Sequence, residues 1–231
     1  MYQVYSGATP NVFKITLLLE ELGARYRTCP VAVHEGEQRS AAFRSLNPNS
    51  KIPVLVDHEP TGGGDPIPVF ESGAILIYLA EKHGRYLPAE PRARSAVLQW
   101  LMWQMGGLGP MAGQVHHFVH YSDQADTYAA ARYLHEIRRL YAVLDGVLET
   151  RRFVADEYSI ADMAIWPWVY FHDLHVIALE DYPNVRRYFA EIADRPAAVK
   201  AMNGLVVRPS PVTEERMKRA LFGVLPSDVA R

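Results

Sequence analysis

Hydrophobic and polar positions in the first 87 residues alternate between two periods. Short runs in which every residue or every second residue is apolar predict strands, whereas apolar residues spaced three or four apart predict helices. The pattern predicts strands at 2–5, 26–33, 51–57 and 67–70, and helices at 10–22, 41–46 and 72–82. A strand–helix–strand unit implies a parallel pair, and two strands joined by a short loop imply an antiparallel hairpin.

From residue 88 onward the pattern is helical and contains no convincing strand. The predicted helices cover 92–104, 124–149, 160–170, 185–194 and 197–202, and a further short helix is expected from Glu214. A proline-containing segment, 86–91, reads as a linker. We therefore predict an α/β domain at 1–87 in βαβ-ββα order, followed by an all-helical domain with a C-terminal tail at 88–231.

Composition narrows the function classes. The 231 residues include 24 Lys and Arg against 26 Asp and Glu, a net charge of −2. Electrostatic capture of nucleic acid or of an anionic membrane is therefore not expected. Cys29 is the single cysteine, which excludes an intrachain disulfide and a Cys-x-x-Cys pair. The chain shows no basic segment followed by an apolar leader and no apolar run of about 20 residues, so we expect a soluble cytoplasmic protein.

Two short motifs in the α/β domain suggest a ligand site. Pro53 enters a predicted strand; the ordinary interpretation is a trans proline that starts the strand, whereas a cis bond would turn the Ile52 backbone outward to pair with an extended peptide. Ser72 begins a predicted helix, where its hydroxyl and the backbone amides could bind a carboxylate or simply cap the helix. Glu71 beside such a site fits a ligand that also carries an ammonium group.

Other polar residues favour structural roles. Ser159 and Asp162 have the spacing of a capping box, and we assign Asp162 to folding. His116 and His120 lie one helical turn apart, but no nearby carboxylate or cysteine completes a metal site, so an aromatic pocket wall is the favoured interpretation and no metal is predicted. The glycine-rich segment 106–110 predicts a kink or a close approach inside a helical stretch.

The motifs and their order resemble the cytosolic glutathione S-transferases. The resemblance rests on Asn49-Ser50-Lys51-Ile52-Pro53, on Glu71-Ser72-Gly73-Ala74-Ile75-Leu76 and on Ser159-x-x-Asp162, and it covers residues 1–203. The sequence is more specifically similar to the bacterial Nu class, through Thr9-Pro10-Asn11-x-x-Lys14, Gly106-Gly107-Leu108-Gly109-Pro110-Met111 and His116-His117-Phe118. The tail beyond Met202 matches no pattern of the family.

The resemblance implies a thioredoxin-like first domain, a cis Ile52–Pro53 bond, a homodimer, and glutathione as cosubstrate. It places Thr9 and Asn11 at the glutathione sulfur as the catalytic residues. It assigns glutathione binding to Gln38, Lys51, Ile52, Pro53, Glu71, Ser72 and Arg132.

Three functions follow as alternatives. In the first, which the Nu class favours, bound glutathione thiolate reduces a disulfide; in the second, it conjugates an electrophilic carbon. The third is a non-catalytic glutathione-binding regulatory protein. No cysteine lies in residues 6–14, so the protein cannot form a mixed disulfide there, and a disulfide reaction would need a second glutathione as the resolving thiol.

Overall fold

The computed structural model describes residues 1–122, 127–204 and 219–221. These residues divide into two compact units, one formed by 1–78 with 200–204 and 219–221, and the other by the described residues of 79–199. The helix expected from Glu214 lies outside the described residues. None of the described helices is long and apolar enough to cross a membrane.

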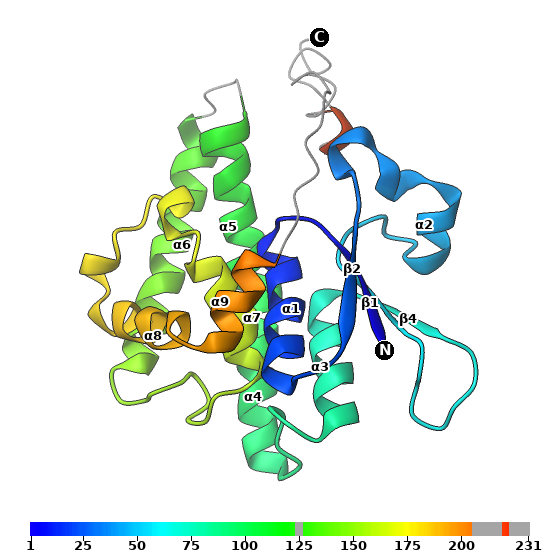
Figure 1. Cartoon of the computed structure of the whole chain (residues 1–231). Helices are drawn as coiled ribbons and strands as arrows, with labels where there is room; N and C mark the ends of the chain where they lie inside the picture. Colours follow the sequence, from blue (N-terminus) through cyan, green and yellow to red (C-terminus); the bar gives the residue numbers. More distant parts are fainter. Residues whose placement is uncertain (123–126, 205–218, 222–231) are drawn as a thin grey trace. The chain divides into compact units, whose positions relative to one another are not determined.

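The first unit contains a four-stranded sheet in the order β2-β1-β3-β4 (Figure 1). β1 pairs with β2 in parallel and with β3 in antiparallel, and β3 and β4 form an antiparallel hairpin, as the sequence predicts. The strands are β1 (Tyr2–Ser6), β2 (Tyr26–Pro30), β3 (Val54–Asp57) and β4 (Ile67–Phe70); the helices are α1 (Pro10–Leu22), α2 (Ala41–Leu46) and α3 (Ser72–His83). This confirms the βαβ-ββα order and the thioredoxin-like domain.

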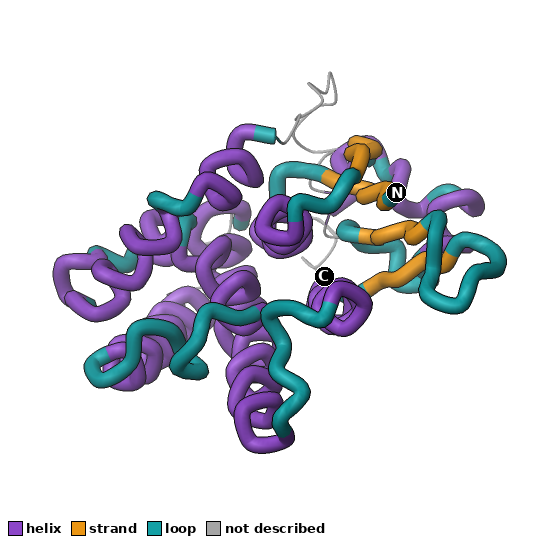
Figure 2. Tube along the Cα trace, turned by 60° about the horizontal axis from the view of Figure 1, so that its bottom comes forward, coloured by secondary structure: helices purple, strands orange, loops and turns teal. Residues whose placement is uncertain are grey.

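Both faces of the central strand β3 are buried, and Figure 2 shows the strands side by side with helices beside them. Val54 and Leu55 are neighbours on β3 and point to opposite faces, yet neither is exposed to solvent. On one face, Val54 and Val31 pack with Phe43 of α2, and the Phe43 ring meets the Tyr5 ring edge-on at 5.8 Å. A sheet covered on both faces holds the loops at its ends in fixed positions.

Two predicted strands are shorter in the structure. β2 ends at Pro30 rather than at Val33, and two 3-10 turns, η1 (Val33–Glu35) and η2 (Glu37–Arg39), follow. β3 begins at Val54 rather than at Lys51, because Pro53 has no amide to donate to a neighbouring strand. The residues that the sequence pattern added to the strands therefore belong to loops.

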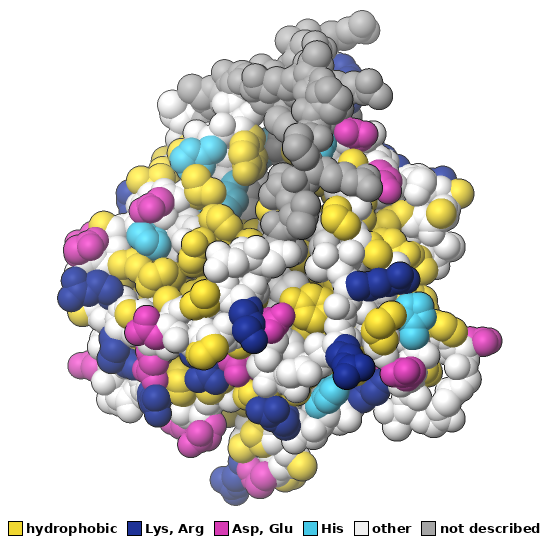
Figure 3. Space-filling view, in the orientation of Figure 1, with side chains coloured by type: hydrophobic (Ala, Val, Ile, Leu, Met, Phe, Trp, Pro, Cys, Tyr) yellow, Lys and Arg dark blue, Asp and Glu magenta, His cyan; other side chains and the backbone are white. Residues whose placement is uncertain are grey.

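The second unit is helical. Its α-helices are α4 (Pro91–Trp103), α5 (Gly109–Val115), α6 (Thr127–Leu148), α7 (Ile160–Val169) and α8 (Pro183–Ala193), and α9 (Pro196–Asn203) continues into the first unit. The π-helical segments are η3 (Gln104–Leu108) and η4 (His116–Tyr121), and short 3-10 turns occur at η5 (His172–His175) and η6 (Leu179–Asp181). Basic and acidic side chains are interspersed over the face in Figure 3.

The glycine-rich segment forms the π-helical turn η3 rather than a helix end. A side-chain carbon at Gly109 would lie 2.6 Å from Gln104 Nε2 and 3.3 Å from the Gln104 carbonyl oxygen. The predicted close approach is therefore confirmed at Gly109, where a larger residue would collide with the preceding turn. A π-turn absorbs the extra residue while the chain stays helical.

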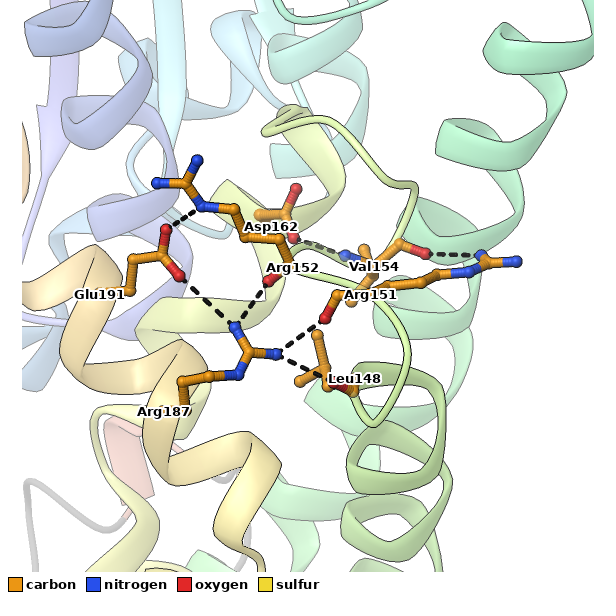
Figure 4. Close-up of polar contacts among 7 residues, drawn as sticks. All are labelled: Leu148, Arg151, Arg152, Val154, Asp162, Arg187 and Glu191. Atoms are coloured by element: carbon orange, nitrogen blue, oxygen red, sulfur yellow. Dashed lines mark hydrogen bonds and ion pairs between the residues drawn. The ribbon is translucent and has the colours of Figure 1, made fainter.

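The capping box at the start of α7 is confirmed. Asp162 Oδ2 accepts hydrogen bonds from the Ser159 amide at 2.9 Å and from the Ser159 hydroxyl at 3.1 Å. Asp162 Oδ1 also accepts from the amide of Val154 at 3.1 Å, so one buried carboxylate holds both the helix start and the loop before it (Figure 4). These contacts agree with the structural role assigned to Asp162.

Arg187 of α8 holds the C-terminal end of α6 (Figure 4). Its guanidinium donates to the carbonyl oxygens of Leu148 at 2.9 Å, Arg151 at 2.8 Å and Arg152 at 3.3 Å. Glu191, which also forms an ion pair with Arg152, lies 3.5 Å from the same guanidinium. One side chain thereby satisfies carbonyl groups that a helix end leaves without partners.

Candidate active site

The start of α1 presents hydrogen-bond donors. Thr9 is the N-cap, with an extended backbone, and its Oγ1 accepts from the amide of Val12 at 3.4 Å. Because Oγ1 acts as the acceptor in that bond, the hydroxyl proton can still be donated to a ligand. Pro10 and Asn11 follow in the first turn, and Asn11 is half-buried. This end of a helix carries partial positive charge and favours an anion.

The loop before β3 is held by a buried asparagine. Asn47 is 1% exposed; its Nδ2 donates to the Lys51 carbonyl oxygen at 2.7 Å, and its Oδ1 accepts from the Asn49 amide at 2.8 Å. The Ile52–Pro53 peptide bond after this turn is cis, as the resemblance implies.

The side chain of Ile52 reaches the loop that precedes α1. A side-chain carbon at Gly7 would lie 2.8 Å from Ile52 Cδ1, so a larger residue there would displace Ile52. Gly7 stands two residues before Thr9. The cis-proline loop and the loop that leads to Thr9 are therefore packed against each other within the first unit.

The start of α3 is the third part of the site. Glu71 adopts a positive φ of 70°, which a non-glycine residue rarely does, and Ser72 at the helix start is 4% exposed. Asn49 Nδ2 donates to Glu71 Oε1 at 3.3 Å, which connects the cis-proline loop to this helix. Backbone strain of this kind is often found where a residue is held for binding.

Lys14, which belongs to the motif that begins at Thr9 but was given no role in the sequence analysis, contacts Ser72. Its Nζ donates to Ser72 Oγ at 3.3 Å, and the side chain is 1% exposed. Burial lowers the pKa of Lys14 to about 7, and the nearby Glu71 carboxylate opposes that decrease. A signal was present in the sequence, because Lys14 interrupts the otherwise mostly apolar run 12–19 on a helix that packs on a sheet.

Gln38 lies on η2, between β2 and α2. The residue is 7% exposed, and its Oε1 is buried without a hydrogen-bond donor among the residues that the structure describes. An orphaned acceptor in the interior is costly, so it suits a ligand that brings its own donor. Lys51 is exposed and Pro53 is buried, both on the loop before β3.

Arg132 belongs to the other unit. It is exposed on α6, whereas Thr9, Asn11, Gln38, Lys51, Ile52, Pro53, Glu71 and Ser72 all lie in the first unit. The first unit thus carries eight of the nine predicted site residues. The role of Arg132 in the site stays a prediction.

The histidines of η4 contribute to an aromatic cluster in the second unit. His116 stacks on His175 at 5.0 Å between ring centroids and on Trp168 at 6.0 Å. Tyr141 lies with its hydroxyl 3.0 Å from His175 Nδ1. Burial lowers the pKa of His116 to about 4 and that of His175 to about 3. Across the described parts of the chain, no three His, Cys, Asp or Glu side chains gather as a metal site would require.

Comparison with known families matches two parts of the chain to two domains of one family. Residues 1–81 match the family described as glutathione S-transferase, N-terminal domain, and residues 108–196 match glutathione S-transferase, C-terminal domain. The chain belongs to the glutathione S-transferase family. The matched ranges together span most of the chain, and they agree with the thioredoxin-like and all-helical units of the structure.

Three relatives of this chain carry two kinds of description, disulfide-bond oxidoreductase and transcriptional regulator. The disulfide-bond oxidoreductase YfcG of Escherichia coli is 49% identical over 87% of this chain and 94% of its own length. The disulfide-bond oxidoreductase YghU of the same organism is 42% identical over 84% and 72%. The transcriptional regulator URE2 of Saccharomyces cerevisiae is 32% identical over 88% and 68%.

Solved structures of glutathione transferases share the fold. One from Burkholderia graminis, with two glutathione molecules bound per subunit, has a TM-score of 0.83 and 41% identity over 87% of each chain. One from Pseudomonas putida, with one glutathione disulfide bound per subunit, has a TM-score of 0.82 and 42% identity over 87% of this chain and 90% of its own.

Proposed function

We propose that this glutathione S-transferase is a glutathione-dependent disulfide-bond oxidoreductase in which the attacking thiolate belongs to bound glutathione. The observation that carries the proposal is the chemistry at the start of α1. Thr9 and Asn11 provide donors there, but residues 6–14 contain no cysteine. The protein thus supplies an anion site and leaves the sulfur to the ligand. The names of YfcG and YghU support the same reaction class.

The donors at α1 serve to ionise the glutathione thiol. A thiol with a pKa of about 8.5 is only about 3% thiolate at pH 7. Lowering that pKa by about two units makes it roughly three-quarters thiolate, a gain of about 20-fold. The Thr9 hydroxyl, the Asn11 side-chain amide and the first amides of α1 stabilise the charged form through hydrogen bonds and the helix dipole.

The remaining residues are proposed to bind the tripeptide. Ser72 and the start of α3 suit the α-carboxylate of the γ-glutamyl end, and the Glu71 carboxylate suits its ammonium group. The backbone of Ile52, exposed by the cis bond to Pro53, pairs with the cysteinyl residue. The other proposed contacts come from the side chains of Gln38, Lys51 and Arg132. The buried, orphaned Gln38 Oε1 fits a donor from glutathione.

The reaction proceeds by two thiol–disulfide exchanges. The bound glutathione thiolate attacks one sulfur of the substrate disulfide; a glutathione–substrate disulfide forms and the other substrate sulfur leaves as a thiolate. A second glutathione then attacks the glutathione sulfur of this mixed disulfide, which releases the second substrate thiol and forms glutathione disulfide. One disulfide is reduced and two glutathiones are oxidised. The Burkholderia protein binds two glutathione molecules, which are the reductants of this reaction, and the Pseudomonas protein binds glutathione disulfide, which is its product; both support the proposed reaction.

Turnover of two substrates separates the alternatives. With glutathione present, we expect rapid reduction of 2-hydroxyethyl disulfide and slow conjugation of 1-chloro-2,4-dinitrobenzene. Faster conjugation than reduction would favour a transferase. Glutathione binding with no turnover of either substrate would favour a non-catalytic regulator. The similarity to the transcriptional regulator URE2 is the reason to test this class.

We further propose a cytoplasmic homodimer with the glutathione site near the subunit boundary. Membership of the glutathione S-transferase family supports the dimer, and the absence of a membrane-length helix among the described residues agrees with this location. Sedimentation at micromolar concentration should show a species of twice the 26.1 kDa chain mass. A species of the mass of one chain would contradict the dimer.

A further inference from the structure

Lys14 is a buried lysine in a mostly apolar part of α1. Every residue from Val12 to Leu19 is buried, and Lys14 itself is 1% exposed. Lysine is almost never fully buried unless it is paired, because an ammonium group loses its hydration in the interior. An apolar side chain of similar length, such as methionine, would fill the same space without that cost.

The contacts of Lys14 point toward the start of α3. Its Nζ donates to Ser72 Oγ at 3.3 Å, and the Glu71 carboxylate is the charged group that favours its protonated form. An ammonium group can only donate, so Ser72 Oγ accepts in this bond. Toward Lys14 the Ser72 oxygen is therefore an acceptor, and the hydroxyl keeps a proton of its own.

We propose that Lys14 is a positioning residue for glutathione, which fixes the Ser72 hydroxyl as a donor to the γ-glutamyl α-carboxylate and adds positive charge behind it. The inference rests on the proposed glutathione-binding function. An uncharged Lys14 amine could instead accept the Ser72 proton and withdraw it from the ligand. Burial brings the pKa of Lys14 to about 7, and a bound carboxylate would favour the ammonium form.

This arrangement gives α1 two roles in one site. Thr9 and Asn11 at its start are proposed to act on the glutathione sulfur, and Lys14, about one turn further along, acts through Ser72 on the other end of the ligand. A rigid helix that contributes to both ends fixes the distance between them. Lys14 thereby contributes to binding the ligand, whereas the contacts with the sulfur belong to Thr9 and Asn11.

The test replaces Lys14 with methionine and compares two ligands. The ligands are glutathione and γ-aminobutyryl-cysteinyl-glycine. The second ligand lacks only the α-carboxylate of the γ-glutamyl residue and keeps its amine. We expect Lys14→Met to raise the dissociation constant for glutathione about tenfold or more, the effect of losing a charge-assisted contact. Binding of the analogue should be the same in both proteins.

Stability and kinetics distinguish positioning from folding. Lys14→Met should unfold at the same urea concentration as the wild type or a higher one, because a buried charge is replaced by an apolar chain. The KM for glutathione should rise while kcat stays within about twofold, since Lys14 does not contact the sulfur. Thr16→Val is the matched control, because Thr16 is a buried polar residue of the same helix whose hydroxyl donates to the carbonyl oxygens of Val12 and Phe13; it should leave glutathione binding unchanged.

A double-mutant cycle tests the route through Ser72. On a Ser72→Ala background, Lys14→Met should weaken glutathione binding by less than it does alone. If Lys14→Met does not fold, Lys14→Gln replaces it in the same comparison, with the same ligand-selective loss expected. Unchanged glutathione binding, or an equal loss for both ligands, would overturn the positioning role while leaving the proposed function intact. Failure of the wild type to bind glutathione would overturn the proposed function itself.

Discussion

The side-chain amide of Asn47 donates to the carbonyl oxygen of Lys51 at 2.7 Å, across the turn that leads to the cis-proline bond. The same buried side chain accepts from the Asn49 amide at 2.8 Å. Asn49 in turn contacts Glu71 beside the start of α3. The buried side chain of Asn47 thus supports the turn that leads to Ile52.

We predict that Asn47→Ala lowers the free energy of unfolding by about 1–2 kcal/mol, because it removes two part-buried hydrogen bonds, to the Lys51 carbonyl and from the Asn49 amide. Glutathione binding should weaken as well, since the Ile52 backbone loses its support. Urea unfolding and calorimetric titration measure the two effects. Ser45→Ala, an exposed change on neighbouring α2, should alter stability by less than about 0.5 kcal/mol. Equal stability of the two variants would contradict the account.

Thr9 and Asn11 should both contribute to turnover, but only Thr9 should also contribute to stability. Loss of a hydrogen-bond donor to a charged sulfur costs roughly 1.5–3 kcal/mol, or about 10- to 100-fold in rate. Thr9→Ala should lose that activity and about 1 kcal/mol of stability, because Thr9 also caps α1. Asn11→Ala should lose activity with little loss of stability.

Thr9→Ser is the matched control and should keep both activity and stability, because it retains the hydroxyl. The double variant should be less than additive if both donors act on one sulfur. Full turnover in Thr9→Ala and Asn11→Ala would mean that backbone amides alone activate the thiol.

The stability of the helical unit should depend on pH through His175. Burial lowers the pKa of His175 to about 3, so the folded protein keeps this imidazole neutral while the unfolded chain takes up a proton below about pH 6.5. The contribution of His175 to the free energy of unfolding is therefore present above pH 6.5 and is lost as the pH falls from 6.5 toward 3.

Between pH 7 and pH 5, wild-type stability should fall about 2 kcal/mol further than that of His175→Gln, at about 1.4 kcal/mol per pH unit. Urea unfolding at both pH values measures the difference. His135→Gln, a change at an exposed histidine of α6, should keep the wild-type pH dependence. Parallel pH dependence in wild type and His175→Gln would rule out His175 as the cause.

Periodicity and cap residues predicted the regular elements because they record local preferences. α2 was expected at 41–46 and occurs at Ala41–Leu46, and α1 was expected at 10–22 and occurs at Pro10–Leu22, where the left-handed Gly23 ends it. The 3-10 turns at 33–39 carry no such period, so the pattern extended β2 into them. The π-turns η3 and η4 likewise look like ordinary helix, because one extra residue barely changes the apolar spacing.

The site was predicted through motifs more than through periodicity. Ser72 and Glu71 could be interpreted from helix capping and ligand charge, whereas the geometry of Asn47 depends on contacts within a loop that no local preference specifies. Lys14 was quoted in a motif but given no role, because a lysine on a predicted helix is ordinarily exposed. Its burial, and its contact with Ser72 on a helix 58 residues further along, come only from the tertiary structure.

The central claim is that the thiolate which attacks the disulfide comes from glutathione and not from the protein. Cys29 is the only cysteine; it lies half-buried on β2, and its Sγ accepts a hydrogen bond from Gln3 Nε2 at 3.1 Å. Cys29→Ser keeps a small side chain that can accept the same bond, and it leaves a protein without thiols.

The decisive measurement is the glutathione-dependent reduction of 2-hydroxyethyl disulfide by Cys29→Ser, compared with the wild type at equal concentration and with circular dichroism as the check on folding. We predict a kcat/KM within about twofold of the wild-type value. A loss of more than about tenfold in a folded protein would show that the protein thiol takes part and would contradict the account.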